Sequence, residues 1–376
     1  MKIIGLPFKI KEPILACGAD LKGAFALAKG NKAYLAEGFG PLSDPDNLAA
    51  YETSIYACEE RLGIRPKVIA CDLHPDYLSG RFAETHALKL TTTDLRRVQH
   101  HEAHIASAVV EHSIRTDVIG VAFDGTGYGP DGRIWGGEFF VGGLKELRRA
   151  AHLEYMPMPG GEAAIREPWR MAVSYLYGAF GRNFLKQAPA VVRARGRKRL
   201  SMLVKMMDNN INSPLTSSAG RLFDAAGCLV LGKESASFEA ELPMELERMA
   251  SPANDDRYKF GIKFKNGMRI IEASGPVKGI VSDLRKKRDK NIISAKFHNT
   301  IAEMIAQTAS LLRKSSGLRK VVLSGGVFQN RYLVKKTALL LNKNSFDVYI
   351  HSGINTNDYG IPIGQLAIAN ARGRCV

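Results

Sequence analysis

The amino-acid sequence predicts an α/β protein built as two similar units with a mostly helical insertion. The same strand–turn–strand opening occurs twice, in ILACGADLKGAFALAKGNKAYLAEGFG and again in TDVIGVAFDGTGYGPDGRIWGGEFFVGGL. From about Pro157 to Met268 the pattern is mostly helical and basic, and the chain then returns to alternating helices and strands. Two equivalent openings are what a duplicated fold would give, and 376 residues suffice for two or three units with sizeable cores.

The elements of the first unit follow from its turn residues and apolar runs. Short strands alternate with glycines, and Gly30–Asn31 marks a turn between two of them. We expect a helix over about Leu48–Leu62, a buried strand in PKVIACDLH, and a further helix through His100–His112. These elements assign residues 1–115 to the first unit.

The second unit begins with two apolar β runs, separated by a Gly-rich turn and by the turn at Asp131–Gly132. After the insertion we expect a helix over Ala295–Lys314, a strand in KVVLSGGV, another helix, a strand in FDVYI, and a last helix from about Pro362. The second unit therefore covers residues 116–376, with the insertion at about 157–275.

The composition indicates a globular protein with an anionic ligand or partner. Hydrophobic residues make up 45% and charged residues 24%, and no apolar run is long enough for a membrane span or a signal peptide. The net charge of +16 suits a nucleotide, RNA or an acidic partner, although the basic runs Arg193–Arg199 and Arg285–Lys290 are most simply solvated helix ends. The scattered cysteines, without a CxxC pair, predict reduced thiols in a cytoplasmic protein. They are Cys17, Cys58, Cys71, Cys228 and Cys375.

The stretch VQHHEAH offers the first candidate site. His100 and His104 are four residues apart, so on a helix they share one face and can bind one ion. Two surface histidines would give the same spacing, and further ligands must come from elsewhere in the chain. His101 and Glu102 point off that face and are not expected to be ligands.

Two aspartates in Gly-rich turns are the candidates for further ligands. Asp124 follows a buried strand in VAFDGTGYG and can hold a cation beside a phosphate that the glycine amides approach, or it can cap a turn. Asp358 lies in NTNDYGIPIGQ, between a strand and a helix, where a helix cap and a metal ligand are equally good interpretations.

Other loops have the character of binding loops. The strand in LSGGVFQN ends in Ser-Gly-Gly at the start of a helix, which presents free amides to phosphate or sugar, although no Gly-Lys-Ser/Thr follows it. Arg166 and Arg221 can clamp an anion or pair with nearby acids, as Arg221 can with Asp224. Lys22 can stabilise an anionic transition state or be a solvated turn lysine, and His298 is expected to be packed.

Seven stretches are more specific together than any one of them alone: ACDLHPDYLSGR, VQHHEAH, FDGTGYGPDGRIWGGEF, MPGGEAAIREPWRM, TSSAGRLFDA, KFHNT and LSGGVFQNRYL. In this order they closely resemble the carbamoyltransferase domain of the HypF family, which acts in the maturation of nickel–iron hydrogenases. The resemblance covers about Pro13 to Asn370. It implies the actin/hexokinase/Hsp70-like fold, a duplicated RNase H-like unit, shared with antibiotic O-carbamoyltransferases and the tRNA threonylcarbamoyltransferase.

The resemblance implies a site for one Fe or Zn ion, since ligand type alone does not decide between them. Carried over residue by residue, the ligands are His100, His104, Asp124 and Asp358. Lys22 matches a family lysine and is the candidate for stabilising the carbamoyl group or phosphate, so the catalytic candidates are Lys22, His100 and His104. An adenine nucleotide, as carbamoyl-adenylate or ATP, would contact three segments. Their residues are Gly125, Thr126 and Gly127, then Gly220 and Asp224, then Ser324, Gly325 and Gly326.

The family reaction implies two partners for this chain. Carbamoyl-adenylate is made by a separate, YrdC-like adenylating domain, and the carbamoyl group then passes to the C-terminal cysteine thiolate of HypE. Glu102, Tyr359 and Asp20 depart from the family's usual residues without touching the ligand positions. Because the adenylating region has no counterpart here, the chain alone is not expected to make carbamoyl-adenylate.

Two alternatives stay open. One is an O-carbamoyltransferase or a tRNA threonylcarbamoyltransferase-like enzyme, for which the basic charge leaves RNA as a possible but unfavoured partner. The other is a non-catalytic, nucleotide-binding scaffold that keeps the fold.

Overall fold

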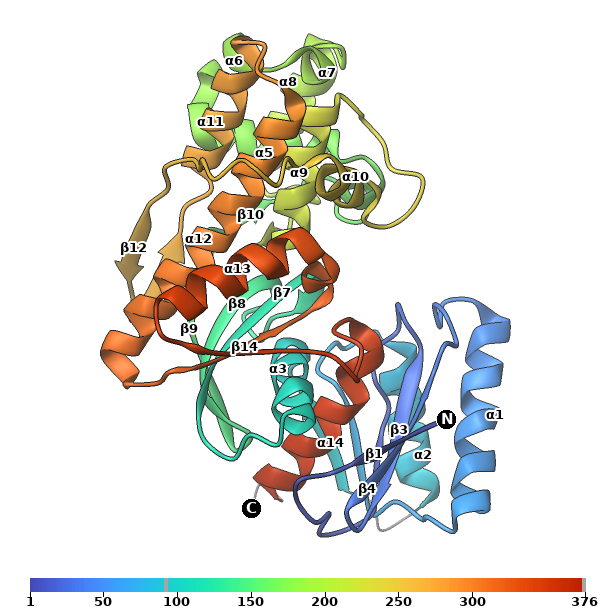
Figure 1. Ribbon diagram of the computed structural model, residues 1–376. Helices are drawn as coiled ribbons and strands as arrows, with labels where there is room; N and C mark the ends of the chain where they lie inside the picture. Colours follow the sequence, from blue (N-terminus) through green and yellow to red (C-terminus); the bar gives the residue numbers. More distant parts are fainter. Residues whose placement is uncertain (91–93, 374–376) are drawn as a thin grey trace.

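The computed structural model describes residues 1–90 and 94–373 and contains two β-sheets with helices packed around and between them (Figure 1). The first sheet has six strands in the order β1-β4-β3-β2-β5-β6. Its strands are β1 (Lys2–Gly5), β2 (Ile14–Ala16), β3 (Ala24–Lys29), β4 (Lys32–Glu37), β5 (Val68–Asp72) and β6 (Asp94–Val98).

The second sheet has nine strands, with the main order β12-β13-β9-β8-β7-β14-β15. The short strands β10 and β11 pair with each other, and β11 also pairs with β8. The strands are β7 (Val118–Tyr128), β8 (Ile134–Gly143), β9 (Glu146–Leu153), β10 (Met156–Pro157), β11 (Leu215–Thr216), β12 (Ile262–Lys265), β13 (Met268–Ile271), β14 (Lys320–Ser324) and β15 (Asp347–Ile350).

The two sheets repeat one topology. In the first, β2, β3 and β4 form an antiparallel meander, β5 is parallel to β2, and β6 is parallel to β5. In the second, β7, β8 and β9 form the meander, β14 is parallel to β7, and β15 is parallel to β14. The predicted α/β fold with an internal duplication is therefore confirmed.

The helices connect and cover these sheets. Helix α1 begins at Pro45, earlier than expected, because the Asp44 side chain accepts hydrogen bonds from the backbone N–H groups of Asp46 and Asn47. The α-helices are α1 (Pro45–Leu62), α2 (Leu78–Lys89), α3 (His100–Glu111), α4 (Ala163–Arg166), α5 (Trp169–Phe180), α6 (Phe184–Gln187), α7 (Ala190–Arg193), α8 (Arg197–Asp208), α9 (Ala219–Leu231), α10 (Glu241–Met249), α11 (Ser274–Arg285), α12 (Lys290–Ser316), α13 (Arg331–Lys343) and α14 (Ile361–Arg372). The 3₁₀ turns are η1 (Gly181–Asn183), η2 (Gly326–Gln329) and η3 (Asp358–Gly360).

The insertion is mostly helical, as expected, but its last part is not. Figure 1 shows α5 to α11 gathered at the end of the molecule away from both termini. Strands β12 and β13 form a hairpin that extends the second sheet beside β9. Asn266 and Gly267 both have positive φ, at 51° and 78°, which matches the two-residue turn that Asn-Gly favours between strands. The division at residue 115 and the insertion limits stay predictions.

The described cysteines and helices bear on two further expectations. Cys17, Cys58, Cys71 and Cys228 are free, buried thiols, and Cys375 lies outside the described residues. Within residues 1–90 and 94–373, no helix combines the length and the apolar character that crossing a membrane requires.

Helices α3 and α14 pack against each other between the two sheets (Figure 1). Helix α14 also contacts β2, β3 and β5, and α3 contacts β7 and β14, so each half of the chain contributes a helix to the other's sheet. Gly364 permits this close crossing, because a Cβ there would lie 1.8 Å from the carbonyl oxygen of Ala103.

We expect Gly364→Ala to lower the free energy of unfolding by about 2 kcal/mol or more, since two backbones must move apart. Alanine is otherwise the better helix former by about 1 kcal/mol, so a net loss reports the clash. Urea unfolding followed by circular dichroism measures the change. Gly80→Ala in helix α2, where the nearest atom to an added Cβ would be 3.9 Å away, is the matched control. Equal stability of both variants would contradict the tight crossing.

Candidate functional site

Helix α3 places two histidine side chains on one buried face. The Gln99 side chain caps the helix by accepting from the Glu102 N–H, so the helix begins at His100. His100 and His104 are each 1% exposed, and their ring centroids are 4.9 Å apart. The interpretation as surface histidines is wrong, because the face that carries them is inside the protein.

Asp124 reaches the same place from strand β7. The register of β7 against β8 shifts between Phe123 and Gly127, and this irregularity follows directly after the run of buried apolar residues. A Cβ on Gly127 would lie 2.4 Å from the His101 ring, so glycine lets β7 approach helix α3. Asp124 therefore sits beside the histidine pair instead of capping a solvated turn.

Asp358 arrives from the loop after β15. The cap of the following turn is Asn357, whose side chain accepts from the Tyr359 N–H. The interpretation of Asp358 as a cap is therefore excluded, and the interpretation as a metal ligand remains. Its side chain is buried against the histidines.

The four side chains converge on one point. One ligand atom from each of His100, His104, Asp124 and Asp358 lies within 4.8 Å of the others. The Nε2 atom of His100 is 3.5 Å from Asp124 Oδ2 and 3.7 Å from Asp358 Oδ1, and that of His104 is 3.8 Å and 3.6 Å from the same oxygens. These distances exceed normal hydrogen bonds, and both buried Nε2 atoms lack a hydrogen-bond partner. Two imidazoles and two carboxylates around such a point fit a divalent cation.

The electrostatics of the cluster favour positive charge. Burial would lower the pKa of His104, but the carboxylates of Asp124 and Asp358 outweigh it and raise that pKa. For His100, likewise, burial is outweighed by Asp72, Asp124 and Asp358, and its pKa lies well above the usual value. Conversely, the two histidines hold the pKa of Asp124 well below its ordinary value despite burial. Protons and a metal cation would therefore compete for this site.

The neighbouring residues of the motif have different roles. Burial, and then the charge of His100, holds the pKa of His101 well below its usual value. Its Nδ1 atom is 3.1 Å from Gln99 Nε2, so the amide donates to it. Glu102 pairs with Arg372. Neither side chain belongs to the cluster, as the helical spacing predicts.

Sequence reasoning missed Asp72, the last residue of β5. Its Oδ2 atom lies 2.8 Å from His100 Nδ1, on the ring edge opposite the cluster, and the side chain is fully buried. A carboxylate in this position fixes the imidazole tautomer with Nε2 free to bind. The available signal was an acidic residue at the carboxyl end of the buried strand β5. The adjacent strand, β6, leads directly into the helix that carries the histidines.

We expect Asp72→Asn to weaken metal binding about 10- to 100-fold, because the asparagine no longer holds His100 as firmly. Titration of the metal-free protein with zinc measures the change. The control is Asp94→Asn at the other end of the adjacent strand, which is expected to bind zinc as the unchanged protein does. Unchanged affinity in Asp72→Asn would contradict the orienting role.

A cavity of about 400 Å³ opens beside the cluster. Among its lining residues are six of the predicted site residues: Lys22, Asp124, Gly125, Gly220, Asp224 and Gly326. Thr126, Gly127, Ser324 and Gly325 are not among its lining residues, although each lies within two positions of Gly125 or Gly326, which are. The cavity wall also includes residues that sequence reasoning missed, namely Glu239, Pro243, Met244, Glu247 and Asn330. Most come from α10 and the loop before it, which carry no glycine or motif signal.

Helix α9 begins within the TSSAGRLFD segment. Its start matches one of the two interpretations of this segment, a capped helix with paired charges. Ser218 caps α9 by accepting from the Arg221 N–H, and Arg221 Nε lies 2.8 Å from Asp224 Oδ2. Both charged side chains are buried on the cavity wall. Gly220 packs against β7, since a Cβ there would lie 2.9 Å from the Gly125 Cα. His298 is fully buried and bonded to Ser294 O and Asn330, as expected for a packed residue.

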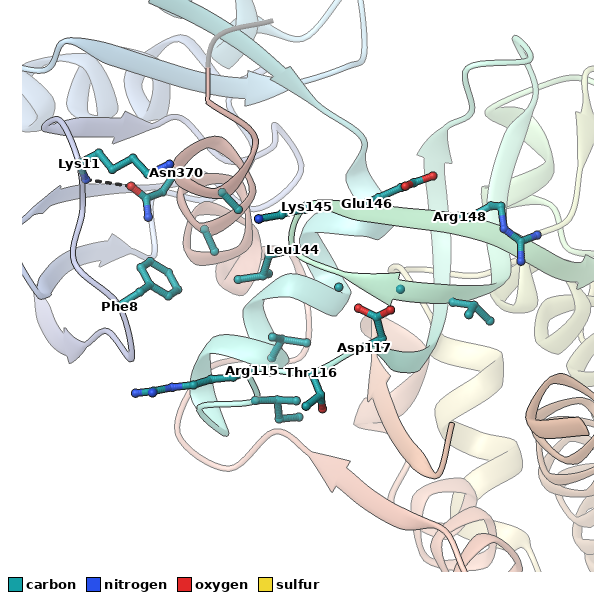
Figure 2. A pocket seen from close by; sticks show the side chains of 17 residues that line it. Phe8, Lys11, Arg115, Thr116, Asp117, Leu144, Lys145, Glu146, Arg148 and Asn370 are labelled. Atoms are coloured by element: carbon teal, nitrogen blue, oxygen red, sulfur yellow. Dashed lines mark hydrogen bonds between the residues drawn. The ribbon is translucent and has the colours of Figure 1, made fainter. Parts of the chain in front are cut away.

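A larger cavity, of about 800 Å³, lies elsewhere. Figure 2 shows it between the β8–β9 hairpin, the end of α14 and the loop that carries Phe8 and Lys11. None of the predicted site residues lines it. The cavity beside the cluster, although smaller, is therefore the candidate nucleotide site.

Comparison with known proteins finds matches over most of the chain. Residues 9–111 match the HypF Kae1-like domain, and residues 120–365 match the carbamoyltransferase Kae1-like domain, second subdomain. A carbamoyltransferase HypF from Synechocystis sp. is 33% identical over 96% of this chain, which covers 48% of that protein. A carbamoyltransferase HypF homolog from Cupriavidus necator is 32% identical, over 95% of this chain and 91% of its own length. The chain thus spans about half the length of most of these curated relatives.

Solved structures agree. A crystal structure described as full-length HypF in the phosphate- and nucleotide-bound form has a TM-score of 0.92 and 37% identity, over 98% of this chain and 47% of that one. The HypF structure from T. kodakarensis has a TM-score of 0.88 and 28% identity, over 98% and 48%. These similarities and the repeated sheet topology confirm the predicted actin/hexokinase/Hsp70-like fold class. We conclude that the chain belongs to the HypF family of carbamoyltransferases and corresponds to its Kae1-like domain.

Proposed function

We propose that this chain is a metal-dependent, nucleotide-binding carbamoyltransferase that moves a carbamoyl group from carbamoyl-adenylate to a cysteine thiolate of a HypE-like acceptor protein. The thiolate sulfur attacks the carbamoyl carbon, a C–S bond forms, the C–O bond to the phosphate breaks, and AMP leaves. The carbamoyl-adenylate would come from a separate YrdC-like adenylating domain or protein.

One observation carries the proposal: Asp124 belongs to both the histidine cluster and the cavity. Its Oδ2 atom faces the two imidazoles, while its Oδ1 atom accepts from the Gly326 N–H, 3.0 Å away, on the cavity wall. A nucleotide in the cavity with its phosphate end toward Asp124 would have that phosphate beside the cluster. This juxtaposition is what a reaction at an acyl phosphate needs.

Lys22 is the one lysine on the cavity wall among the described residues. Burial would lower its pKa, but Asp358, Glu239 and Asp124 outweigh burial and raise it, so the side chain is charged at neutral pH. Its Nζ atom lies 3.7 Å from Glu239 Oε2, a half-exposed partner that a phosphate can replace. We assign to Lys22 the stabilisation of negative charge on the leaving phosphate or the carbonyl oxygen.

The unpartnered Nε2 atoms and the two carboxylates fit one Fe or Zn ion held by His100, His104, Asp124 and Asp358. Such an ion would supply Lewis-acid polarisation at this end of the cavity. All four ligand side chains are buried, so the surrounding protein limits the access of bulk water to the cluster. No covalent intermediate on the chain is required.

The test is direct. The protein is mixed with carbamoyl-adenylate and a HypE-like acceptor, and the acceptor is weighed by mass spectrometry for one added carbamoyl group. Metal analysis of the same sample identifies the ion. Nucleotide binding without transfer to the acceptor would instead support a scaffold role.

A further inference from the structure

Three hydrogen-bonded side chains, those of Glu111, His351 and Ser324, lie behind the cluster. None of them offers a ligand atom to the cluster or lines the cavity. His351, directly after β15, has its Nδ1 atom 2.6 Å from Glu111 Oε2 and its Nε2 atom 2.9 Å from Ser324 Oγ. The exposed fractions of the His351 and Glu111 side chains are 3% and 10%, and Ser324 is fully buried. Burial in this form leaves the hydroxyl without access to a substrate, so the three residues do not form a nucleophilic site.

The proton positions follow from the partners. Hydrogen bonds from His351, Gly353 and Ser352 outweigh burial and hold the pKa of Glu111 below its usual value, so its carboxylate is ionised. Burial, in turn, lowers the pKa of His351 and keeps the imidazole neutral. Nδ1–H then donates to Glu111, Nε2 is an acceptor, and the Ser324 hydroxyl donates to it. The Ser107 hydroxyl also lies near this Nε2 atom, but at 3.5 Å it is farther away than the Ser324 hydroxyl at 2.9 Å.

Glu111 and Ser324, the two outer residues of this hydrogen-bonded set, connect to different parts of the proposed site. Glu111 is the last residue of α3, the helix that carries both candidate histidine ligands. It also accepts from the Ser352 N–H, 2.8 Å away, and so anchors the start of the loop that ends at Asp358. His351 thus joins the loop to the C-terminal end of α3, away from the candidate ligands His100 and His104.

Ser324 continues the connection to the nucleotide side. It precedes Gly325, whose N–H donates to Thr356 O at 3.0 Å and whose φ is +106°. A Cβ at Gly325 would lie 2.3 Å from Phe123 O, so the loop packs closely against β7 at a position that only glycine fits. The next N–H, of Gly326, donates to Asp124. Glu111, His351 and Ser324 therefore connect elements that carry all four candidate ligands and the Ser-Gly-Gly loop.

We propose that Glu111, His351 and Ser324 are positioning residues that couple the metal cluster to the nucleotide loop, so that each site is well formed only when the other is. The inference rests on the proposed function, since it assumes that both sites bind. If so, removing one of these three side chains lowers the affinity for the metal and for the nucleotide together. This is expected although none of the three lines the cavity or offers a ligand atom to the cluster.

The test compares His351→Ala with His112→Ala. His112 also joins the end of α3 to β15, through Nε2 and the Ile350 carbonyl oxygen at 2.8 Å, but makes no bond to Ser324. We expect His351→Ala to weaken both zinc and AMP binding about 10-fold or more, in line with other residues that orient metal ligands. His112→Ala is expected to lower the thermal midpoint without changing either affinity. Excess zinc should restore AMP binding in His351→Ala, which a globally loosened fold would not show.

Ser324→Ala keeps the inference testable if His351→Ala does not fold, because it removes one buried hydroxyl only. We expect it to weaken zinc binding several-fold, and the double variant with His351→Ala to bind no worse than His351→Ala alone. Retained affinities in folded His351→Ala and Ser324→Ala, or equal losses in His112→Ala, overturn the inference while leaving the proposed function intact. Absence of both zinc and AMP binding in the unchanged protein overturns the proposed function, and the inference with it.

Discussion

His104→Ala is expected to leave the protein folded but without its metal ion and without carbamoyl transfer. The variant removes one of two imidazoles from a cluster in which both carboxylates already face the same point. The remaining His100, Asp124 and Asp358 would hold a cation weakly, and two uncompensated carboxylates favour protons instead. We expect transfer from supplied carbamoyl-adenylate to fall at least about 100-fold, more than the loss of an outer residue causes.

The measurement pairs metal content per chain with the mass of the acceptor after reaction. His112→Ala is the matched control, since that histidine is the C-cap of the same helix and lies outside the cluster. It should retain metal and transfer. Full transfer by a metal-depleted His104→Ala protein would show that the metal role is wrong, even if the fold and the nucleotide cavity are right.

Helical spacing alone was enough to sort the histidine motif. A period of 3.6 residues places His100 and His104 on one face and sends His101 and Glu102 elsewhere, and the structure has this arrangement. Local sequence could not distinguish a buried face from an exposed one. That depends on the packing of α3 against β7 and against α14, and the contact with α14 joins residues more than 200 positions apart.

The distant ligands show the same limit. Asp124 and Asp358 were candidates for further ligands, but each also had a good local interpretation as a cap, and only the resemblance favoured the ligand role over the cap. In the structure Asn357 is the cap beside Asp358, a distinction of one residue that propensities do not resolve. Asp72 lies in ACDLHPDYLSGR, one of the stretches that carry the resemblance, but it was assigned no role there, because its role depends on β5 lying beside β6 in a parallel pair.

The hairpin in the insertion was missed for a different reason. Its strands are short and mostly half-exposed, so the apolar alternation that predicts a strand is weak. The Asn266–Gly267 pair was the available signal for a turn between two strands. The pairing of β13 with β9 supplies the stabilisation that the local sequence lacks.

Lys22→Met is expected to lower the rate of carbamoyl transfer about 100-fold while leaving metal content unchanged. Methionine keeps much of the apolar stem that packs on the cavity wall and removes the charge. Loss of one positioned donor to a developing negative charge typically costs about 10²- to 10³-fold in kcat. Because Lys22 offers no ligand atom to the cluster, metal analysis should not change.

The kinetic pattern separates this role from simple binding. A lysine that acts on charge developing in the transition state lowers kcat more than it raises KM for carbamoyl-adenylate, whereas one that only holds the phosphate raises KM. Lys29→Met, at the exposed end of β3, controls for the loss of a positive charge. Glu239→Gln removes the only carboxylate paired with Lys22 among the described ion pairs and should leave kcat no lower. If Lys22→Met transfers as fast as Lys29→Met, Lys22 is a solvated lysine at the cavity edge, and the charge at the carbonyl must be stabilised by other groups.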